Sequence, residues 1–233
     1  MKKILALVAM LLVVTISAAP AATVTRITVS GEGTVAVMPD QATVRASVVT
    51  NAENAEQAVS QNNVIYARLV DATVATGVAR DDITLAYYNI NYIPRPKPAP
   101  NEVAPTGPFG YVVSRSFDVK VRNVGKSGAV VDALTKAGVT NVESVNFGLA
   151  DSSRARGVAT TKAMADAREK AGEIASAAGL HIVGIEDISN GAAVRFPAPM
   201  MKAMAVSEAA PTVFDSGNVN VTADLTVVFL AQP

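Results

Sequence analysis

Hydrophobic and polar residues alternate along several stretches of this chain, as they do in strands with one buried and one solvated face. The clearest stretch lies near the C-terminus, where every second residue from Val219 to Phe229 is apolar. Residues 41–50 and 111–122 carry the same pattern, and weaker strand patterns cover residues 24–37, 83–93, 142–149 and 181–189. Strict alternation is typical of antiparallel sheets, so we expect antiparallel pairing.

Three other stretches repeat apolar residues at the period of a helix, and we predict helices over 54–76, 124–137 and 152–178. A glycine follows each of them, as is common where a helix ends. We expect Ser152 or Ser153 to cap the third helix, which would be about 40 Å long. Small side chains dominate its inner stripe and would let it lie close to a sheet: Ala155, Ala159, Ala163, Ala167, Ala171, Ala175 and Ala178.

The order of these elements predicts an α+β fold. Between residues 41 and 149 the order is β-α-β-β-α-β, which is that of the ferredoxin-like or split βαβ arrangement. Residues 24–37 and 152–231 supply a strand, a helix and two further strands. We therefore predict a ferredoxin-like portion with an additional strand-helix-strand-strand extension, which forms a second sheet-and-helix portion.

Two long irregular segments separate predicted strands. Pro94–Pro108 contains six prolines, and residues 191–217 are rich in alanine, proline and methionine. Both exceed the usual length of a connection in a compact domain, which makes them candidates for function or for contact between subunits.

The first 21 residues have the features of an export signal. Two lysines precede the apolar run Ile4–Ile16, and Ala19 and Ala21 provide the small-residue pattern of a signal peptidase site. The run is too short for a bilayer, which needs roughly 20 residues. We expect cleavage after Ala21 and export of residues 22–233, to the periplasm if the cell is Gram-negative. No second apolar stretch is long enough to span a membrane.

Composition narrows the classes of function. The chain has no cysteine, which excludes disulfides, thiolate metal sites and a cysteine nucleophile. It has 20 basic and 20 acidic side chains without a block of like charge, so neither a nucleic-acid footprint nor a polybasic membrane patch is present. With no tryptophan and 5% aromatic residues, the core should consist of valine, alanine, isoleucine and leucine.

Two features suggest a cofactor site at first sight. Residues 31–36 match the glycine pattern G-x-G-x-x-A of dinucleotide-binding turns. A nucleotide site would need a helix to begin there, whereas Val35 and Val37 continue a strand pattern, so we expect a bulge or kink at Gly31 and Gly33. His181 is the single histidine and cannot by itself form a triad or a multi-histidine metal site. We expect it to be a partly exposed residue at the start of a strand.

The remaining candidates are methionines, carboxylates and tyrosines. Met200, Met201 and Met204 are candidate ligands of Cu(I), or else flexible padding of an apolar contact. We expect Asp40 to shape a turn, and the paired carboxylates Asp81-Asp82 and Glu186-Asp187 to point in opposite directions if they lie in strands. Three tyrosines of one predicted strand line a cleft or serve packing: Tyr87, Tyr88 and Tyr92. We predict no catalytic residue and no cofactor, because the chain has no serine elbow, P-loop, H-E-x-x-H or EF-hand pattern.

Three ordered motifs resemble the SIMPL-domain family of exported bacterial proteins, which includes periplasmic immunogenic proteins and proteins named for oxidative-stress defence. The first motif is Ile27–Gly33 followed by Met38–Ala42, and the second is Ala163–Ala171 followed by Ala178–Leu180. The third is Gly217–Ala223, where Ser216-Gly217 replaces the family's usual Pro-Gly. Together they make the resemblance extend over residues 24–231, so we expect one SIMPL domain over 22–233.

The resemblance implies no catalytic residues, a link to envelope and oxidative stress, and a capacity for self-assembly. We therefore expect a non-catalytic periplasmic protein that acts as a homo-oligomeric scaffold or binding protein of the cell envelope. A small-ligand or copper-binding protein is the alternative, and a hydrolytic enzyme ranks last. The proline-rich loop and the methionine cluster lie outside the family pattern.

Overall fold

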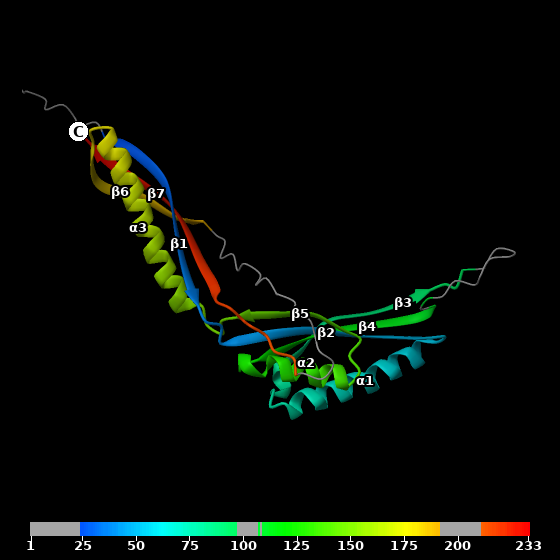
Figure 1. Cartoon of the computed structure of the whole chain (residues 1–233). Helices are drawn as coiled ribbons and strands as arrows, with labels where there is room; N and C mark the ends of the chain where they lie inside the picture. The colour runs from blue at the N-terminus through cyan, green and yellow to red at the C-terminus, as the bar shows by residue number, and fades with distance from the viewer. Residues whose placement is uncertain (1–23, 97–106, 108, 192–210) are drawn as a thin grey trace, which may run out of the picture.

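The computed structural model describes residues 24–96, 107, 109–191 and 211–233, which form two sheet-and-helix units (Figure 1). The α+β class predicted from the sequence is confirmed, and each predicted strand and helix is present close to its expected bounds. In chain order the elements are β1 (Thr25–Val37), β2 (Gln41–Ala52), α1 (Ala55–Ala75), β3 (Ile83–Ile93), β4 (Gly110–Val121), α2 (Ser127–Lys136), β5 (Asn141–Gly148), α3 (Ser153–Ala177), β6 (His181–Gly191) and β7 (Val219–Gln232).

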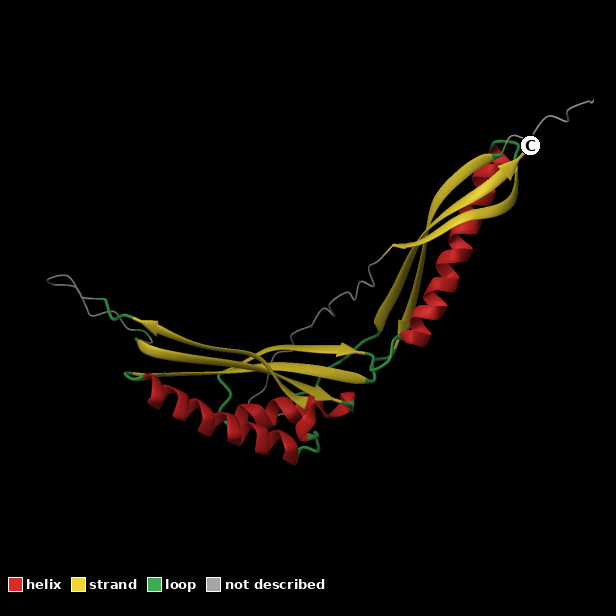
Figure 2. Cartoon of the chain, turned by 180° about the vertical axis from the view of Figure 1, so that it is seen from behind, coloured by secondary structure: helices red, strands yellow, loops and turns green. Residues whose placement is uncertain are grey.

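The larger unit is a four-stranded antiparallel sheet with α1 and α2 on one face (Figure 2). Its strands lie in the order β3-β4-β2-β5, and along the chain its elements follow the predicted β-α-β-β-α-β order. α1 begins after Asn54, whose side chain accepts a hydrogen bond from the Gln57 N–H. The core between sheet and helices contains large side chains, among them Phe117, Leu69 and Leu134.

The smaller unit is the antiparallel sheet β1-β7-β6, and α3 packs across β1 and β7. The alanine stripe is buried from Ala155 to Ala175, as predicted, whereas Ala178 follows the last helical turn and is exposed. A Cβ at Gly31 or Gly33 would lie 2.1 Å from a backbone carbonyl oxygen of α3. Helix and strand therefore touch backbone to backbone, with no room for side chains between them.

The expected bulge at Gly31 and Gly33 is wrong. β1 pairs with β7 without interruption, Gly31 opposite Leu225 and Gly33 opposite Ala223. β1 also continues to Val37, so no helix begins at the glycines as a nucleotide site would require. The two residues are glycines because α3 lies directly on them.

The helices end at the predicted glycines, but the start of α3 differs from the predicted serine cap. Gly138 and Gly179 adopt the left-handed conformation expected after a helix, with φ of 94° and 68°. The Ser153 N–H, however, donates to Asp151 Oδ1 at 2.8 Å, so Asp151 supplies the contact expected of a serine. Hydrogen bonds from the Ser153 side chain and backbone N–H lower the pKa of Asp151.

The two units lie end to end, as the two opposite views show (Figures 1 and 2). At the junction, Asp40 Oδ1 accepts a hydrogen bond from the Ala150 N–H at 2.7 Å. The segment before β7 is held on the larger unit, because the Thr212 N–H and hydroxyl both donate to the Asp132 carboxylate. Among the described residues, no helix has both the length and the apolar character needed to cross a membrane.

Candidate interaction site at a sheet edge

Four strands of the described chain lie at the edge of a sheet: β1 and β6 in the smaller unit, and β3 and β5 in the larger. An edge strand presents backbone N–H and C=O groups that can pair with another chain. The four edges differ in how well these groups are protected.

The edge of β1 is occupied by side chains of α3. Lys170 Nζ donates to the carbonyl oxygen of Ser30 at 3.1 Å, and Lys162 Nζ donates to that of Thr34 at 3.0 Å. Between them, Asp166 Oδ2 accepts from the Glu32 N–H at 2.8 Å. Because residues 30, 32 and 34 are every second residue of the strand, these are backbone groups that point to the same side. The helix therefore satisfies three of the groups that a further strand would need.

Asp166 is held in its charged form at this edge. Its carboxylate accepts a hydrogen bond from Lys170 at 2.7 Å as well as the one from the Glu32 N–H. The hydrogen bond from Lys170 is the largest cause, and the Glu32 N–H the second, of a lowered pKa of Asp166. At neutral pH the protective contact on β1 is consequently a fixed ionic one.

The edges of β6 and β5 are protected in other ways. β6 is interrupted by two register shifts, which lie between Ile182 and Gly184 and between Ile185 and Asp187. The second shift places Glu186 in a bidentate ion pair with Arg26 across the sheet, and hydrogen bonds from Arg26 lower the pKa of Glu186. β5 is a short strand, carries Glu143 and has Phe147 against Phe214 with ring centroids 6.1 Å apart. Bulges, charges and covering segments are common protections of sheet edges.

Among the described edge strands, β3 is the least protected, with a single register shift near its start. It is 11 residues long, contains neither charge nor proline, and has β4 as its one partner among the described strands. Most of its side chains are exposed on both faces, and the exposed fraction reaches 54% at Tyr87 and 60% at Tyr92. One register shift lies between Leu85 and Tyr87, and from Tyr87 to Ile93 the pairing with β4 is regular. This open edge of β3 is the candidate site.

A cluster of aromatic rings around Arg115 holds β3 in place. The guanidinium of Arg115, on β4, lies 4.5 Å from the ring centroid of Tyr66 on α1 and 5.0 Å from that of Tyr88 on β3. Its Nη2 donates to Asn63 Oδ1 at 2.7 Å. Cation–π contacts on both sides link helix, central strand and edge strand. The open edge is thus presented on a fixed frame.

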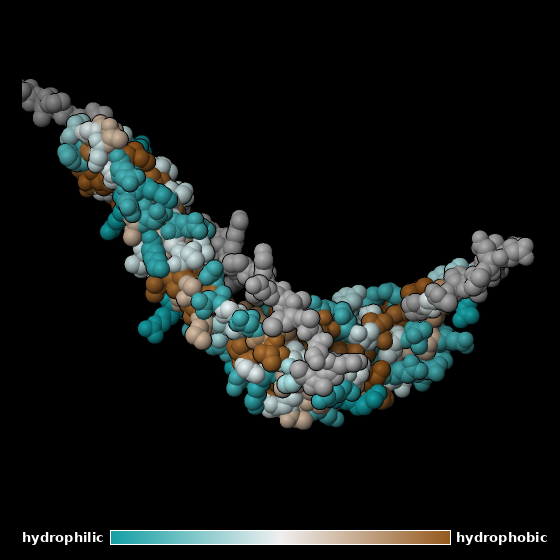
Figure 3. Space-filling model, in the orientation of Figure 1, coloured by the Kyte–Doolittle hydropathy of each residue, from teal (hydrophilic) through white to brown (hydrophobic). Residues whose placement is uncertain are grey.

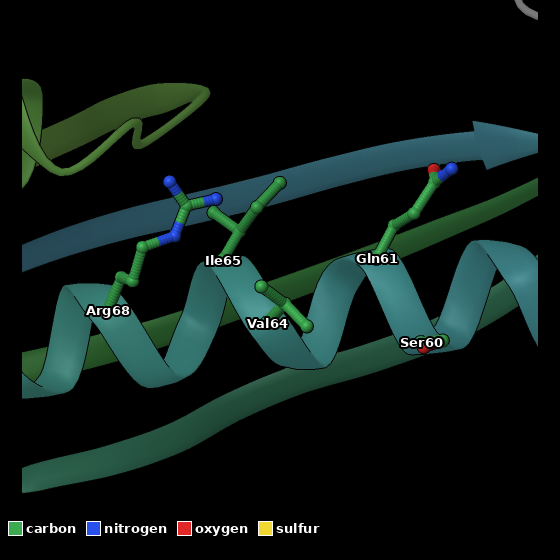
Figure 4. A pocket seen from close by; sticks show the side chains of 5 residues that line it. All are labelled: Ser60, Gln61, Val64, Ile65 and Arg68. Atoms are coloured by element: carbon green, nitrogen blue, oxygen red, sulfur yellow. The ribbon is translucent and has the colours of Figure 1, made fainter.

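Apolar side chains are also exposed on β6, among them Val183 and Ile188. On the face shown in Figure 3, hydrophobic residues reach the surface in small groups among hydrophilic ones. A depression of about 300 Å³ lies on α1 and is lined by Ser60, Gln61, Val64, Ile65 and Arg68 (Figure 4). All of these come from a single helix, and Gln61, Ile65 and Arg68 point to the same side of it. The lining offers a hydroxyl, an amide and a guanidinium without a neighbouring base, so it provides no pair for nucleophilic catalysis.

The structure places the residues that the sequence singled out as follows. Tyr87, Tyr88 and Tyr92 all lie on β3. Tyr92 packs against Tyr111 with ring centroids 5.1 Å apart, although it is 60% exposed, and Tyr88 lies against Arg115, whereas Tyr87 is mostly exposed. His181 is the exposed first residue of β6, as expected. Met200, Met201 and Met204 lie outside the described residues, as does most of the Pro94–Pro108 loop. Copper binding by these methionines therefore stays a prediction.

The paired carboxylates do not meet. Asp81 and Asp82 lie in a short 3-10 helix, not in a strand, and Asp82 is buried against Arg122 with two hydrogen bonds of 2.8 Å. Glu186 and Asp187 lie at a bulge of β6. Within the described ranges, no three histidine, aspartate or glutamate side chains gather in a way that would hold a metal ion.

Two signals for the site were present in the sequence. The stretch from Ile83 to Ile93 lacks any charge, which is unusual for an exposed strand. Asp166 and Lys170 are four residues apart, the spacing of neighbours on a helix. What the sequence did not reveal is which strand lies at an edge, because the order of strands in a sheet depends on long-range pairing.

Comparison with known proteins agrees with the sequence motifs. The pattern of the SIMPL family, described as a protein of unknown function (DUF541), matches residues 27–229. A protein of Brucella melitensis named "26 kDa periplasmic immunogenic protein" is 29% identical over 177 residues, which are 76% of this chain and 71% of that protein. The "Uncharacterized protein YggE" of Escherichia coli K12 is 25% identical over 213 residues, which are 89% of this chain and 83% of that protein.

Proposed function

This chain belongs to the SIMPL family, and from that premise we propose that it is a non-catalytic periplasmic protein that assembles with copies of itself through the open edge of β3. In this role it acts as a scaffold or binding protein of the cell envelope. The observation that carries the proposal is the contrast between edges: Lys162, Asp166 and Lys170 bind backbone groups of β1, whereas β3 is long, uncharged and, within the described part of the chain, without a strand on its outer side.

The periplasmic location has two independent supports. The N-terminal residues have the charge, apolar run and small-residue site of an export signal. The Brucella relative is named as periplasmic. The link to oxidative stress rests on the family resemblance alone and stays a prediction.

Self-assembly is supported by the physics of the edge. Backbone groups on the outer side of β3 have no strand partner among the described residues, and a second strand would pair with them directly. Residues 22–233 carry 18 basic and 20 acidic side chains, a formal net charge of −2, so long-range repulsion between copies is weak. The aromatic side chains of β3 add apolar contact area on both faces of the strand.

Light scattering during size-exclusion chromatography tests the proposal on residues 22–233. We expect the wild type to form assemblies at micromolar concentration and Ile90→Lys to be monomeric, because a lysine at an edge strand opposes further pairing. Val64→Lys is the matched control: it places the same charge at another exposed apolar residue, on α1, and should assemble as the wild type does. Circular dichroism of each variant reports whether it remains folded.

Two results would contradict this proposal. One is a wild type that is monomeric across the micromolar range. The other is a folded Ile90→Lys variant that assembles as the wild type does.

A further inference from the structure

The regular part of β3 has a defined centre. After the register shift that follows Leu85, the strand pairs with β4 without interruption from Tyr87, opposite Ser116, to Ile93, opposite Gly110. Pro94 follows directly and cannot donate a ladder hydrogen bond. The segment available for a new partner is therefore Tyr87–Ile93, and its middle residue is Ile90.

We propose that two copies of the chain pair antiparallel through β3, in the register that places Ile90 opposite Ile90. The inference rests on the proposed self-assembly and adds its geometry. A two-fold axis passes between the two Ile90 residues and joins two four-stranded sheets edge to edge. The helices α1 and α2 of both copies then lie on the same face of the joined sheet.

Symmetry limits the registers that are possible. In an antiparallel pair, residues whose backbone groups point outward must meet residues of the same kind. A two-fold axis satisfies this condition only when a residue of one copy lies directly opposite the same residue of the other copy. The candidates are therefore pairs centred on a single residue of β3.

The centre at Ile90 fits the side chains best. It places Tyr88 opposite Tyr92 on one face, and Asn89 opposite Asn91 on the other. It also uses the whole regular segment, since Tyr87 meets Ile93. Aromatic pairs across strands and matched amides are favourable cross-strand neighbours.

The adjacent centres fit less well. A centre at Asn89 places Tyr87 opposite Asn91 and extends the pairing into the register shift at Ala86. A centre at Asn91 places Tyr88 opposite Pro94, beyond the end of the strand. Each of these registers mixes apolar with polar side chains or loses part of the ladder.

Charge explains why the partner is a second copy. In a symmetric pair every charged residue near the axis meets its own like charge, which is destabilising. β3 has no charged residue, so two copies meet without such a penalty. The same operation on β6 would bring the carboxylates of Glu186 and Asp187 close to their own copies.

Single cysteines test the register, because the natural chain contains no thiol. In the proposed pair, residues at position 90 lie directly opposite, with Cα atoms roughly 4.5–5.5 Å apart, which suits a disulfide. Residues at position 89 are displaced by two positions along the strand and are too far apart. Under a mild oxidant we expect Ile90→Cys to cross-link at least about tenfold faster than Asn89→Cys.

A double variant completes the test. Asn91→Cys alone should cross-link as slowly as Asn89→Cys, whereas the Asn89→Cys/Asn91→Cys variant should cross-link rapidly, since these two positions face each other across the axis. Non-reducing electrophoresis and peptide mapping identify the linked residues. Light scattering of each reduced variant shows whether it still assembles.

The outcomes separate the register from the proposed function. If the reduced variants assemble but Ile90→Cys links no faster than Asn89→Cys, the register is wrong and self-assembly stands. Pairing of β3 with a different strand of the second copy gives that same result and overturns the register. If neither the wild type nor the reduced variants assemble, self-assembly fails and the register fails with it.

Discussion

β1 and β3 are edge strands of similar length in one chain, yet only β1 is closed. The difference originates in how a helix lies beside each strand. α3 rests directly on Gly31 and Gly33, which brings its Lys162, Asp166 and Lys170 within reach of the backbone of β1. α1 instead packs mainly on β2 and β4, the two central strands of the larger sheet. Close helix packing thus decides which edge is free to pair.

The two units also differ in the size of the residues at their helix–sheet interfaces. In the smaller unit the helix contributes alanines, which meet the glycines of β1 and larger side chains of β7 such as Phe229. In the larger unit the helices contribute Leu69 and Leu134, which pack with Phe117. An interface without free space should be sensitive to added volume, and one built from large side chains should be sensitive to removed volume. The predictions that follow test this difference and its consequence for the edges.

The largest effect is expected for Gly33→Val. The valine Cβ would lie 2.1 Å from the carbonyl oxygen of Ala159, and a helix backbone cannot move away as a flexible side chain can. We expect a loss beyond the about 1–3 kcal/mol typical of overpacking, so that α3 separates from its sheet. Hydrogen exchange should rise in β1, β7 and α3 and stay unchanged in α1, β2 and β4, because the two cores share no residue.

Gly172→Ala is the matched control for this prediction. Gly172 lies in the same helix, and a Cβ there would meet nothing within 4 Å. We expect this variant to be more stable by about 0.5–1 kcal/mol, as alanine is in a helix interior. If hydrogen exchange in β1, β7 and α3 of Gly33→Val equals that of the wild type, the interface can accommodate the valine. This outcome would contradict the close packing of α3 on β1.

Next in size is the removal of volume from the larger unit. Phe117 is buried at the centre of that core and packs edge-on against Tyr66, with ring centroids 5.4 Å apart. Phe117→Ala should lower the free energy of unfolding of the unit by about 3–5 kcal/mol. Ala163→Gly, which removes a methyl group from the other interface, should cost only about 1 kcal/mol. If chemical denaturation shows that Phe117→Ala and Ala163→Gly lower the free energy of unfolding equally, the two interfaces do not differ in their sensitivity to removed volume.

A smaller effect is expected from opening the protected edge. Asp166→Ala removes the acceptor of the Glu32 N–H and the ion pair of Lys170. A backbone group of β1 then becomes available, and we expect the protein to form larger assemblies than the wild type in light scattering. Glu169→Ala, on the exposed side of the same helix, should leave the assembly size unchanged. An unchanged size in both variants would mean that the side chains of α3 do not control this edge.

The sequence predicted local features well and long-range ones poorly. The strand over Ile83–Ile93 and the alanine stripe from Ala155 to Ala175 followed from periodicity, which depends on neighbouring residues alone. The role of Gly31 and Gly33 did not, because it depends on which helix lies above them. The edge position of β3 and the Arg115 cluster likewise come from the order of strands in the sheet. The free edge therefore became a site only once the topology was known.

The smallest effect concerns the base of the β3–β4 hairpin, where Asp82 precedes β3 and Arg122 follows β4. Asp82 has a 7% exposed side chain and accepts two hydrogen bonds from Arg122, whose side chain is 74% exposed. These hydrogen bonds are the main reason why the pKa of Asp82 is lowered, and burial opposes them. A lowered folded-state pKa means that the pair stabilises the fold above the ordinary pKa of the carboxyl group. This stability is lost as pH falls through the folded-state value.

Wild type should therefore have a larger free energy of unfolding than Asp82→Asn at neutral pH. In acid the two free energies should converge, as measured by urea unfolding. Asp81→Asn, at the exposed neighbouring residue, should show no such convergence. If the difference in free energy of unfolding between wild type and Asp82→Asn is the same at all pH values, this ion pair is not its source.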